Sequence, residues 1–288
     1  MPRVMEVSLA TAVSEKRAVE LGAIAQEIRF QIVDMVHHAQ SGHISPGLGA
    51  ADIMATLFFQ TMHIDPRDPA MKDRDRFVLS KGHSCPVLYA TLALRGYFPM
   101  EELKTLRQMG TRLQGHPVAG TVPGIEATTG SLGMGASQAV GMALEGRMLH
   151  KDYNIWALLG DGEINEGLIW EAAMAAAKYK LGNLVFIVDR NGLQTDGACE
   201  DVMPTEPIDK KFEAFNWKVM KVDGHNIPEI LTTLQAAREY RNGPVCVIAK
   251  TIKGRGVSFM ENTTEWHAKA PNDEQYARAV AELREVRA

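Results

Sequence analysis

Residues 154–192 read NIWALLGDGEINEGLIWEAAMAAAKYKLGNLVFIVDRNG, and this stretch predicts how the chain folds. The runs Asn154–Gly160 and Leu184–Asp189 are almost continuously apolar, as is typical of strands buried on both faces of a sheet. Glu163–Tyr179 lies between them and has the length and spacing of a helix. A strand, a helix and a second strand predict a right-handed crossover between two neighbouring parallel strands.

The same alternation continues outside this stretch and predicts an α/β fold with a mostly parallel sheet flanked by helices. The further expected strands are Arg76–Ser80, Trp217–Val222 and Val245–Thr251. The further expected helices are Ser84–Gly96, Ser131–Leu149, Pro228–Arg241, the terminal Asp273–Arg287 and, near the N-terminus, Lys16–His38 and Ala50–Met62. We expect one domain over residues 1–288, with residues 1–62 as its helical N-terminal part.

Composition narrows the class of protein. The 288 residues are 45% hydrophobic and 23% charged with a net charge of -4, which fits a globular chain and gives no general attraction to nucleic acid or anionic membrane. The chain has three cysteines, Cys85, Cys199 and Cys246, whose number and spacing exclude a disulfide framework and a CxxC zinc site. An odd number of cysteines fits the reducing environment of the cytoplasm. The uncharged stretch Ala127–Leu144 is rich in glycine and predicts a loop that runs into a helix, not a membrane span.

Oxygen-bearing side chains follow two strands that we expect to be neighbours. Asp161 follows the first strand and Asn191 follows the second, 30 residues later (191 − 161 = 30). Because ligands bind beyond the carboxyl ends of such strands, these groups predict a Mg²⁺ or Ca²⁺ site, with the carbonyl of Leu193 as a third ligand. Mg²⁺ in turn predicts a phosphate-bearing cofactor. Gly-Asp-Gly alone is common in turns, and the strand placement and spacing favour the metal site.

At these residues the sequence resembles thiamine-diphosphate enzymes, in which GDG is followed about thirty residues later by Asn. The flanking sequence segments resemble transketolases in particular. The segments that carry it are SGHISPGLGAADI (41–53), RFVLSKGHSCPVLYATLALRGY (76–97), LQGHPVAGTVPGIEATTGSLGMGAS (113–137) and KTIKGRGVSFMENTTEWHAK (250–269). They occur in the family's order, and their combination is highly specific.

The resemblance implies a role for each matching residue. Asp161 and Asn191 match the side-chain ligands of Mg²⁺, and Leu193 matches the backbone ligand. The residues implied in binding thiamine diphosphate are His83, Gly130, Ser131, Leu132, Asp161, Gly162, Asn191 and His267. The residues implied in catalysis, at the reacting sugar hydroxyls or the cofactor, are His43, His116 and His267. Glu166 matches a carboxylate at the subunit contact of the active dimer.

Histidines suit this chemistry independently of the family, because imidazole donates and accepts protons near neutral pH while a sugar's hydroxyl groups gain and lose them. A lone histidine is more often a packing or surface residue. We expect that ordinary role for His37, His38, His63, His150 and His225. Two departures from the usual family text, Lys81 in SKGH and Val118 in GHPV, leave the identity of the sugar open.

The resemblance also implies a missing half, because a full transketolase is roughly twice this length and carries a second α/β domain. We expect a partner, the C-terminal transketolase subunit with the pyrimidine domain, an α2β2 heterotetramer, and a sugar or sugar-phosphate substrate. The chain would be active only with that partner. Two alternatives stay open: a subunit of another thiamine-diphosphate enzyme, of synthase or 2-oxo-acid type, and a non-catalytic cofactor-binding partner.

Overall fold

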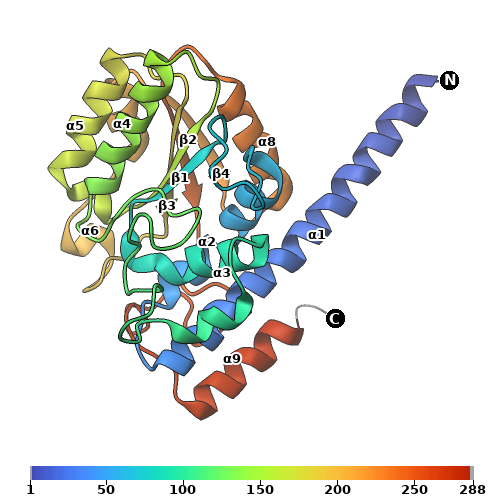
Figure 1. Ribbon diagram of the computed structural model, residues 1–288, viewed down its shortest axis with the longest axis vertical. Helices are drawn as coiled ribbons and strands as arrows, with labels where there is room; N and C mark the ends of the chain where they lie inside the picture. The colour runs from blue at the N-terminus through green and yellow to red at the C-terminus, as the bar shows by residue number, and fades with distance from the viewer. Residues whose placement is uncertain (1, 286–288) are drawn as a thin grey trace.

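A five-stranded parallel sheet forms the centre of the computed structural model, which describes residues 2–285, with side chains from residue 15 onward (Figure 1). The strand order is β1-β2-β3-β5-β4, and every neighbouring pair is parallel. The strands are β1 (Arg76–Leu79), β2 (Ile155–Gly160), β3 (Leu184–Arg190), β4 (Lys218–Asp223) and β5 (Val245–Lys250). The predicted fold class is confirmed, and each predicted strand is present within one residue at either end.

The crossover predicted from residues 154–192 is also present. β2 and β3 pair in parallel, with Gly160 opposite Asp189, and α5 (Gly167–Lys178) connects them. Asp161 and Asn191 therefore leave neighbouring strands at the same carboxyl edge. The register of this pair fixes the position of the candidate site.

Helices cover both faces of the sheet, and alternate residues of each strand enter different cores. Leu158 packs into a core with α1 (Pro2–Ala39), α2 (Ser45–Thr56), α3 (Cys85–Arg95) and α8 (Ile227–Glu239). Leu159 faces the opposite core, which α4 (Met134–Met148), α5 and α7 (Ile208–Ala214) cover. Figure 1 shows α4 and α5 on one side of the sheet, with α2 and α3 on the other.

The N-terminal part is helical, as expected. α2 continues as a π-helical turn over Leu57–Thr61, and α9 (Asp273–Glu285) packs against α1. In Figure 1 the N-terminal end of α1 projects away from the rest of the chain. The predicted terminal helix is present to Glu285, and its expected end at Arg287 lies outside the described residues. Within residues 2–285 we find no helix with the length and apolar character needed to cross a bilayer.

Two predicted helices begin later than their apolar patterns suggest. The helix expected from Ser131 begins at Met134, because Gly133 adopts a left-handed conformation with φ of 83°. The helix expected from Glu163 begins at Gly167, because Glu163–Asn165 form a 3-10 turn and Glu166 is extended. The short helices α6 (Cys199–Val202) and α7 were not predicted. Both helix starts lie beside the candidate site, where the preceding residues adopt loop or 3-10 conformations instead of a regular α-helix.

Candidate active site

A cavity of about 300 Å³ lies at the carboxyl edge of β1, β2 and β3. Most of the predicted site residues line it, namely His43, His83, Gly130, Leu132, Asp161, Gly162, Asn191, Leu193 and His267. Ser131 does not line the cavity, and its side chain is exposed. His116 does not line the cavity either, but its ring lies against Gly130, which does. Residues that are up to 224 positions apart in sequence (267 − 43 = 224) thus meet at one edge of the sheet.

The predicted metal ligands lie together, and Asp161 connects their two loops. Asp161 is 2% exposed, and its Oδ1 and Oδ2 accept hydrogen bonds from the N–H groups of Gly162 and Gly192 at 2.9 and 2.5 Å. The side-chain oxygen of Asn191 accepts the N–H of Leu193 at 3.1 Å. Burial, with a smaller contribution from the charge of Asp189, raises the pKa of Asp161 to about 6.

These oxygens fit Mg²⁺ by their chemistry. A buried carboxylate whose charge is disfavoured by burial gains from a bound divalent cation, and the neighbouring amide and carbonyl oxygens are hard ligands. Within the described part of the chain, no group of three His, Cys, Asp or Glu side chains is arranged to hold a metal. An ion such as Mg²⁺ takes few protein ligands and completes its shell with phosphate and water.

Two buried lysines line the same cavity as the predicted metal ligands. Lys81 and Lys253 are 2% and 1% exposed. The ammonium group of Lys253 donates to the carbonyls of Leu193 and Gln194 at 3.4 and 3.2 Å, and burial lowers the pKa of Lys253 to about 8. Lys81 donates to the carbonyl of Pro46 at 3.2 Å and pairs with Asp189. A diphosphate is the kind of anion that such a cavity can hold.

Four histidines form a cluster at the same cavity. The ring of His43 lies 5.2, 5.3 and 6.3 Å from the rings of His83, His267 and His116. Burial is the main cause that lowers the pKa of His43 to about 4 and that of His267 to about 3. The pKa values of His83 and His116 are lowered for the same reason. The lowered pKa values favour the neutral form of all four imidazoles near pH 7, in which one ring nitrogen donates a hydrogen bond and the other accepts one.

The cluster contains polar atoms that need a ligand. Nδ1 of His43 and Nδ1 of His267 are both buried and have no hydrogen-bond partner among the residues that the structure describes. Because an unsatisfied buried polar atom is costly, these two nitrogens indicate that a hydrogen-bonding molecule fills the cavity.

A glycine-containing loop forms one wall of the cavity. Gly130 has φ of 153°, and a side chain there would meet the ring of His116 at 3.2 Å. The loop rests on the turn after β1, where the hydroxyl of Thr129 donates to the carbonyl of Leu79 at 2.8 Å. The backbone at residues 130–132 is thus held close to the cavity, as contacts to a phosphate group require.

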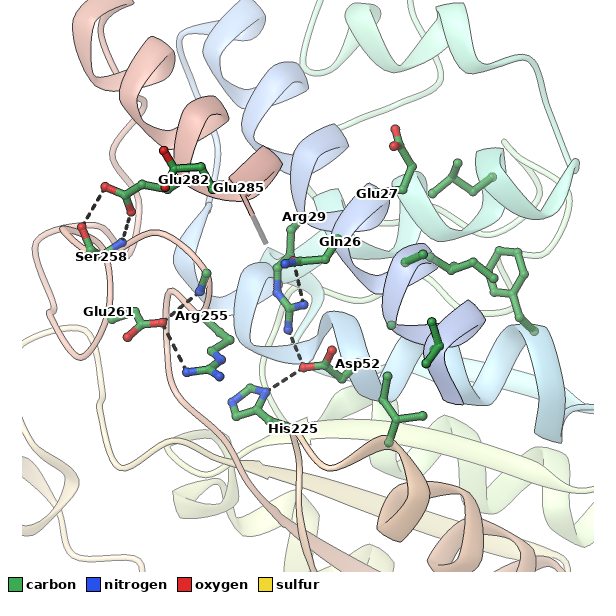
Figure 2. Close-up of a pocket in the computed structure, with 18 residues that line it drawn as sticks. Gln26, Glu27, Arg29, Asp52, His225, Arg255, Ser258, Glu261, Glu282 and Glu285 are labelled. Carbon is green, nitrogen blue, oxygen red and sulfur yellow. Dashed lines mark hydrogen bonds and ion pairs between the residues drawn. The ribbon is translucent and has the colours of Figure 1, made fainter. Parts of the chain in front are cut away.

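A second, larger cavity of about 1230 Å³ lies elsewhere, between α1, the start of α8 and residues 255–261 (Figure 2). Asp52 accepts hydrogen bonds from Arg29 and His225 there, and the second ring nitrogen of His225 accepts the N–H of Ile252 at 2.8 Å. Both ring nitrogens of His225 thus have hydrogen-bond partners within the protein, as expected of a histidine with a packing role. His37, likewise, stacks on Tyr276 with ring centres 4.1 Å apart.

Comparisons with known proteins identify the family. The family model described as "Transketolase, thiamine diphosphate binding domain" matches residues 21–284. The chain belongs to the transketolase family. It is 42% identical to the 6-deoxy-6-sulfo-D-fructose transketolase subunit SqwG of Clostridium sp. (strain MSTE9), over 93% of this chain and 98% of that one. It is also 42% identical to an apulose-4-phosphate transketolase subunit of Phocaeicola vulgatus, over 91% and 92%.

A solved transketolase structure has the same fold. The transketolase from Leishmania mexicana superposes with a TM-score of 0.88 and 32% identity over 91% of this chain. The chain spans only 41% of that protein's length. The chain thus matches almost the whole length of two relatives that are named as subunits. It matches less than half of the Leishmania transketolase.

The sequence alone does not assign a role to some residues that line this cavity. Glu163 is 2% exposed and accepts hydrogen bonds beside Asp161, and Lys253 lies against the predicted metal loop. In the sequence, Glu163 directly follows Gly-Asp-Gly, and Lys253 directly precedes Gly-Arg-Gly. Neither pattern shows that the side chain is buried. Glu166 is exposed at the start of α5, and Val118 lies outside the cavity lining.

Proposed function

We propose that this chain is the cofactor-binding subunit of a transketolase that depends on thiamine diphosphate and Mg²⁺. It would transfer a two-carbon ketol unit from a ketose, or ketose phosphate, to an aldose or aldose phosphate. The observation that carries this proposal is the convergence of Asp161, Asn191 and Leu193 with three histidines in one cavity of a transketolase-family chain, with His116 next to that cavity. The cofactor supplies the electron sink that carbon–carbon cleavage beside a ketone requires.

One set of residues in this chain would bind the cofactor and its metal, and another set would transfer protons. Asp161, Asn191 and the carbonyl of Leu193 would hold Mg²⁺, while Gly162 and the backbone of residues 130–132 would contact the diphosphate. His83 and the two buried lysines would face its negative charge. His43, His116 and His267 would hold the substrate's hydroxyl groups and move their protons, because their neutral rings both accept and donate hydrogen bonds.

A second subunit would complete the site. Single-chain transketolases such as the Leishmania enzyme are more than twice the length that this chain covers, and two relatives of similar length are named as subunits. We therefore propose a C-terminal partner with the pyrimidine domain and an α2β2 assembly, with the exposed Glu166 at a subunit contact. All three cysteines are free and buried, which supports a cytoplasmic location.

The substrate would be a ketose with an anionic group remote from its carbonyl. The two subunit relatives are named for a sulfonated ketose and for a ketose phosphate. Another thiamine-diphosphate reaction on a 2-oxo acid fits less well, because four clustered histidines suit a substrate with several hydroxyl groups. A non-catalytic role fits less well because the histidine cluster and the predicted metal ligands are both present.

The test is a transfer assay with the partner subunit that purifies with this chain. The assembled protein would be supplied with thiamine diphosphate, Mg²⁺, a panel of ketose phosphates and sulfonated ketoses, and an aldose phosphate, and two-carbon transfer would be measured by mass. Omission of the metal or the partner should abolish transfer. Turnover of 2-oxo acids alone would favour the other enzyme class, and an assembled protein that binds no cofactor would overturn the proposal.

A further inference from the structure

One buried carboxylate connects three loops of the candidate site. Oε1 of Glu163 accepts hydrogen bonds from the hydroxyl of Ser80 and from the N–H of Gly133, the latter at 2.9 Å. Oε2 accepts the N–H of Gly160 at 3.0 Å. Glu163 is 2% exposed, so water contributes little to this arrangement. Three donors surround the carboxylate, and they come from the turn after β1, the last residue of β2 and the N-cap of α4.

Each of these loops carries a part of the proposed cofactor site. Ser80 follows β1 and directly precedes Lys81, while Gly160 ends β2 and directly precedes Asp161. Gly133 follows the loop 130–132 and is the N-cap residue of α4. The side chain of Glu163 thus links the backbone that would contact the diphosphate to the strand end that would hold the metal.

We propose that Glu163 is a positioning residue, which sets the distance between the 130–132 loop and the carboxylate of Asp161. This inference rests on the proposed function, because the diphosphate and its metal would span those two groups. A bound ligand that joins two loops gains affinity when the loops are already held at the correct separation. Glu163 would therefore act on cofactor affinity without touching the cofactor.

The packing around Glu163 explains why this side chain suits the position. A side chain at Gly135 would lie 2.6 Å from the Cα of Ser80, so the start of α4 rests directly on the turn after β1. Gly133 has a left-handed φ of 83°, which directs its N–H toward the carboxylate. Glutamine has the same shape as glutamate, but it would place an NH₂ group against one of the three donors. Glutamine at this position therefore removes a contact without opening a cavity.

Asp75 is a matched control at the opposite end of β1. Its buried carboxylate also has three donors, namely the N–H groups of His63 and Asn154 at 2.9 and 2.8 Å and the guanidinium of Arg238 at 2.5 Å. It therefore matches Glu163 in burial and in number of donors, with an ion pair to Arg238 in addition, but it lies away from the candidate site. A substitution there separates a general loss of stability from a loss of cofactor positioning.

The experiment compares Glu163→Gln and Asp75→Asn in the enzyme assembled with its partner subunit. Calorimetry would measure the Kd of thiamine diphosphate at saturating Mg²⁺, and hydrogen exchange of the chain would measure the protection of residues 129–136. We expect E163Q to raise the Kd about tenfold to a hundredfold and to increase exchange in that segment. D75N should lower the thermal midpoint and leave the Kd unchanged.

An unchanged Kd in E163Q, or an equal rise in D75N, would overturn the positioning role of Glu163. If E163Q does not fold, Ser80→Ala removes one donor from the same carboxylate, and it should raise the Kd by a smaller factor. An unchanged Kd in S80A would then overturn the role. A wild-type assembly that binds no thiamine diphosphate would overturn the proposed function together with this inference, whereas normal wild-type binding with an unaffected E163Q would overturn this inference alone.

Discussion

The ammonium group of Lys81, which lines the candidate site, pairs with the carboxylate of Asp189, and both side chains are almost fully buried. The second oxygen of Asp189 accepts the hydroxyl of Thr251. Such a pair is tolerated because each charge compensates the other, so removal of one partner leaves an uncompensated charge in the interior.

Lys81→Met is therefore expected to lower the free energy of unfolding by about 3–5 kcal/mol, as measured by urea denaturation. Lys151→Met is the control, because Lys151 pairs with Asp73 at the surface, with exposures of 36% and 65%. That variant should lose less than about 1 kcal/mol. A K81M chain as stable as wild type would contradict the buried pair.

Asp161→Ala is expected to abolish Mg²⁺-dependent binding of thiamine diphosphate to the assembled enzyme, because it removes the only carboxylate of the proposed ligand set. Calorimetry with and without Mg²⁺ measures this loss. Asp209→Ala, which removes a surface partner of Lys221, is the control and should bind normally. Unchanged cofactor affinity in D161A would refute the assignment of the metal site.

His267→Ala and His116→Ala are each expected to lower the turnover of two-carbon transfer by about 10²–10⁴-fold, the usual contribution of a general acid or base. Their thermal midpoints and cofactor affinity should change much less than their turnover. His150→Ala, at an exposed position, is the control and should keep full activity. Full turnover in both site variants would remove these histidines from the proposed proton transfers.

Acid is expected to destabilise the chain through the histidine cluster. The pKa values of His43 and His267 are lowered to about 4 and 3 in the folded chain, whereas an unfolded imidazole titrates near 6.5. As the pH falls below about 6.5, the unfolded chain binds protons first, and the free energy of unfolding decreases until the folded values are reached. Urea midpoints at pH 7.5 and pH 5 measure this decrease.

His267→Gln should reduce the difference between those two midpoints, because one of the groups with a lowered pKa is gone. His150→Gln is the comparison. A pH difference that is the same in wild type and H267Q would show that His267 does not contribute.

The strands and the site edge were predictable, and the reasons are local. Apolar runs such as Leu184–Asp189 mark buried strands, and a polar residue at the end of each run marks the carboxyl edge. The order of β5 and β4 was not predictable, because it depends on which strand covers the far side of β3. The role of Glu163 was hidden for a similar reason, since its three donors belong to loops up to 83 residues away.

The strand order also affects how the chain folds during its synthesis. β4 stands at an edge of the sheet, and β5, its neighbour within the described residues, is translated after it. On the ribosome, the backbone groups of β4 remain unpaired until residues 245–250 have emerged, and the outer side of β3 stays uncovered for the same interval. Nascent chains that stop before Val245 should therefore aggregate, and they are the species on which chaperones would act.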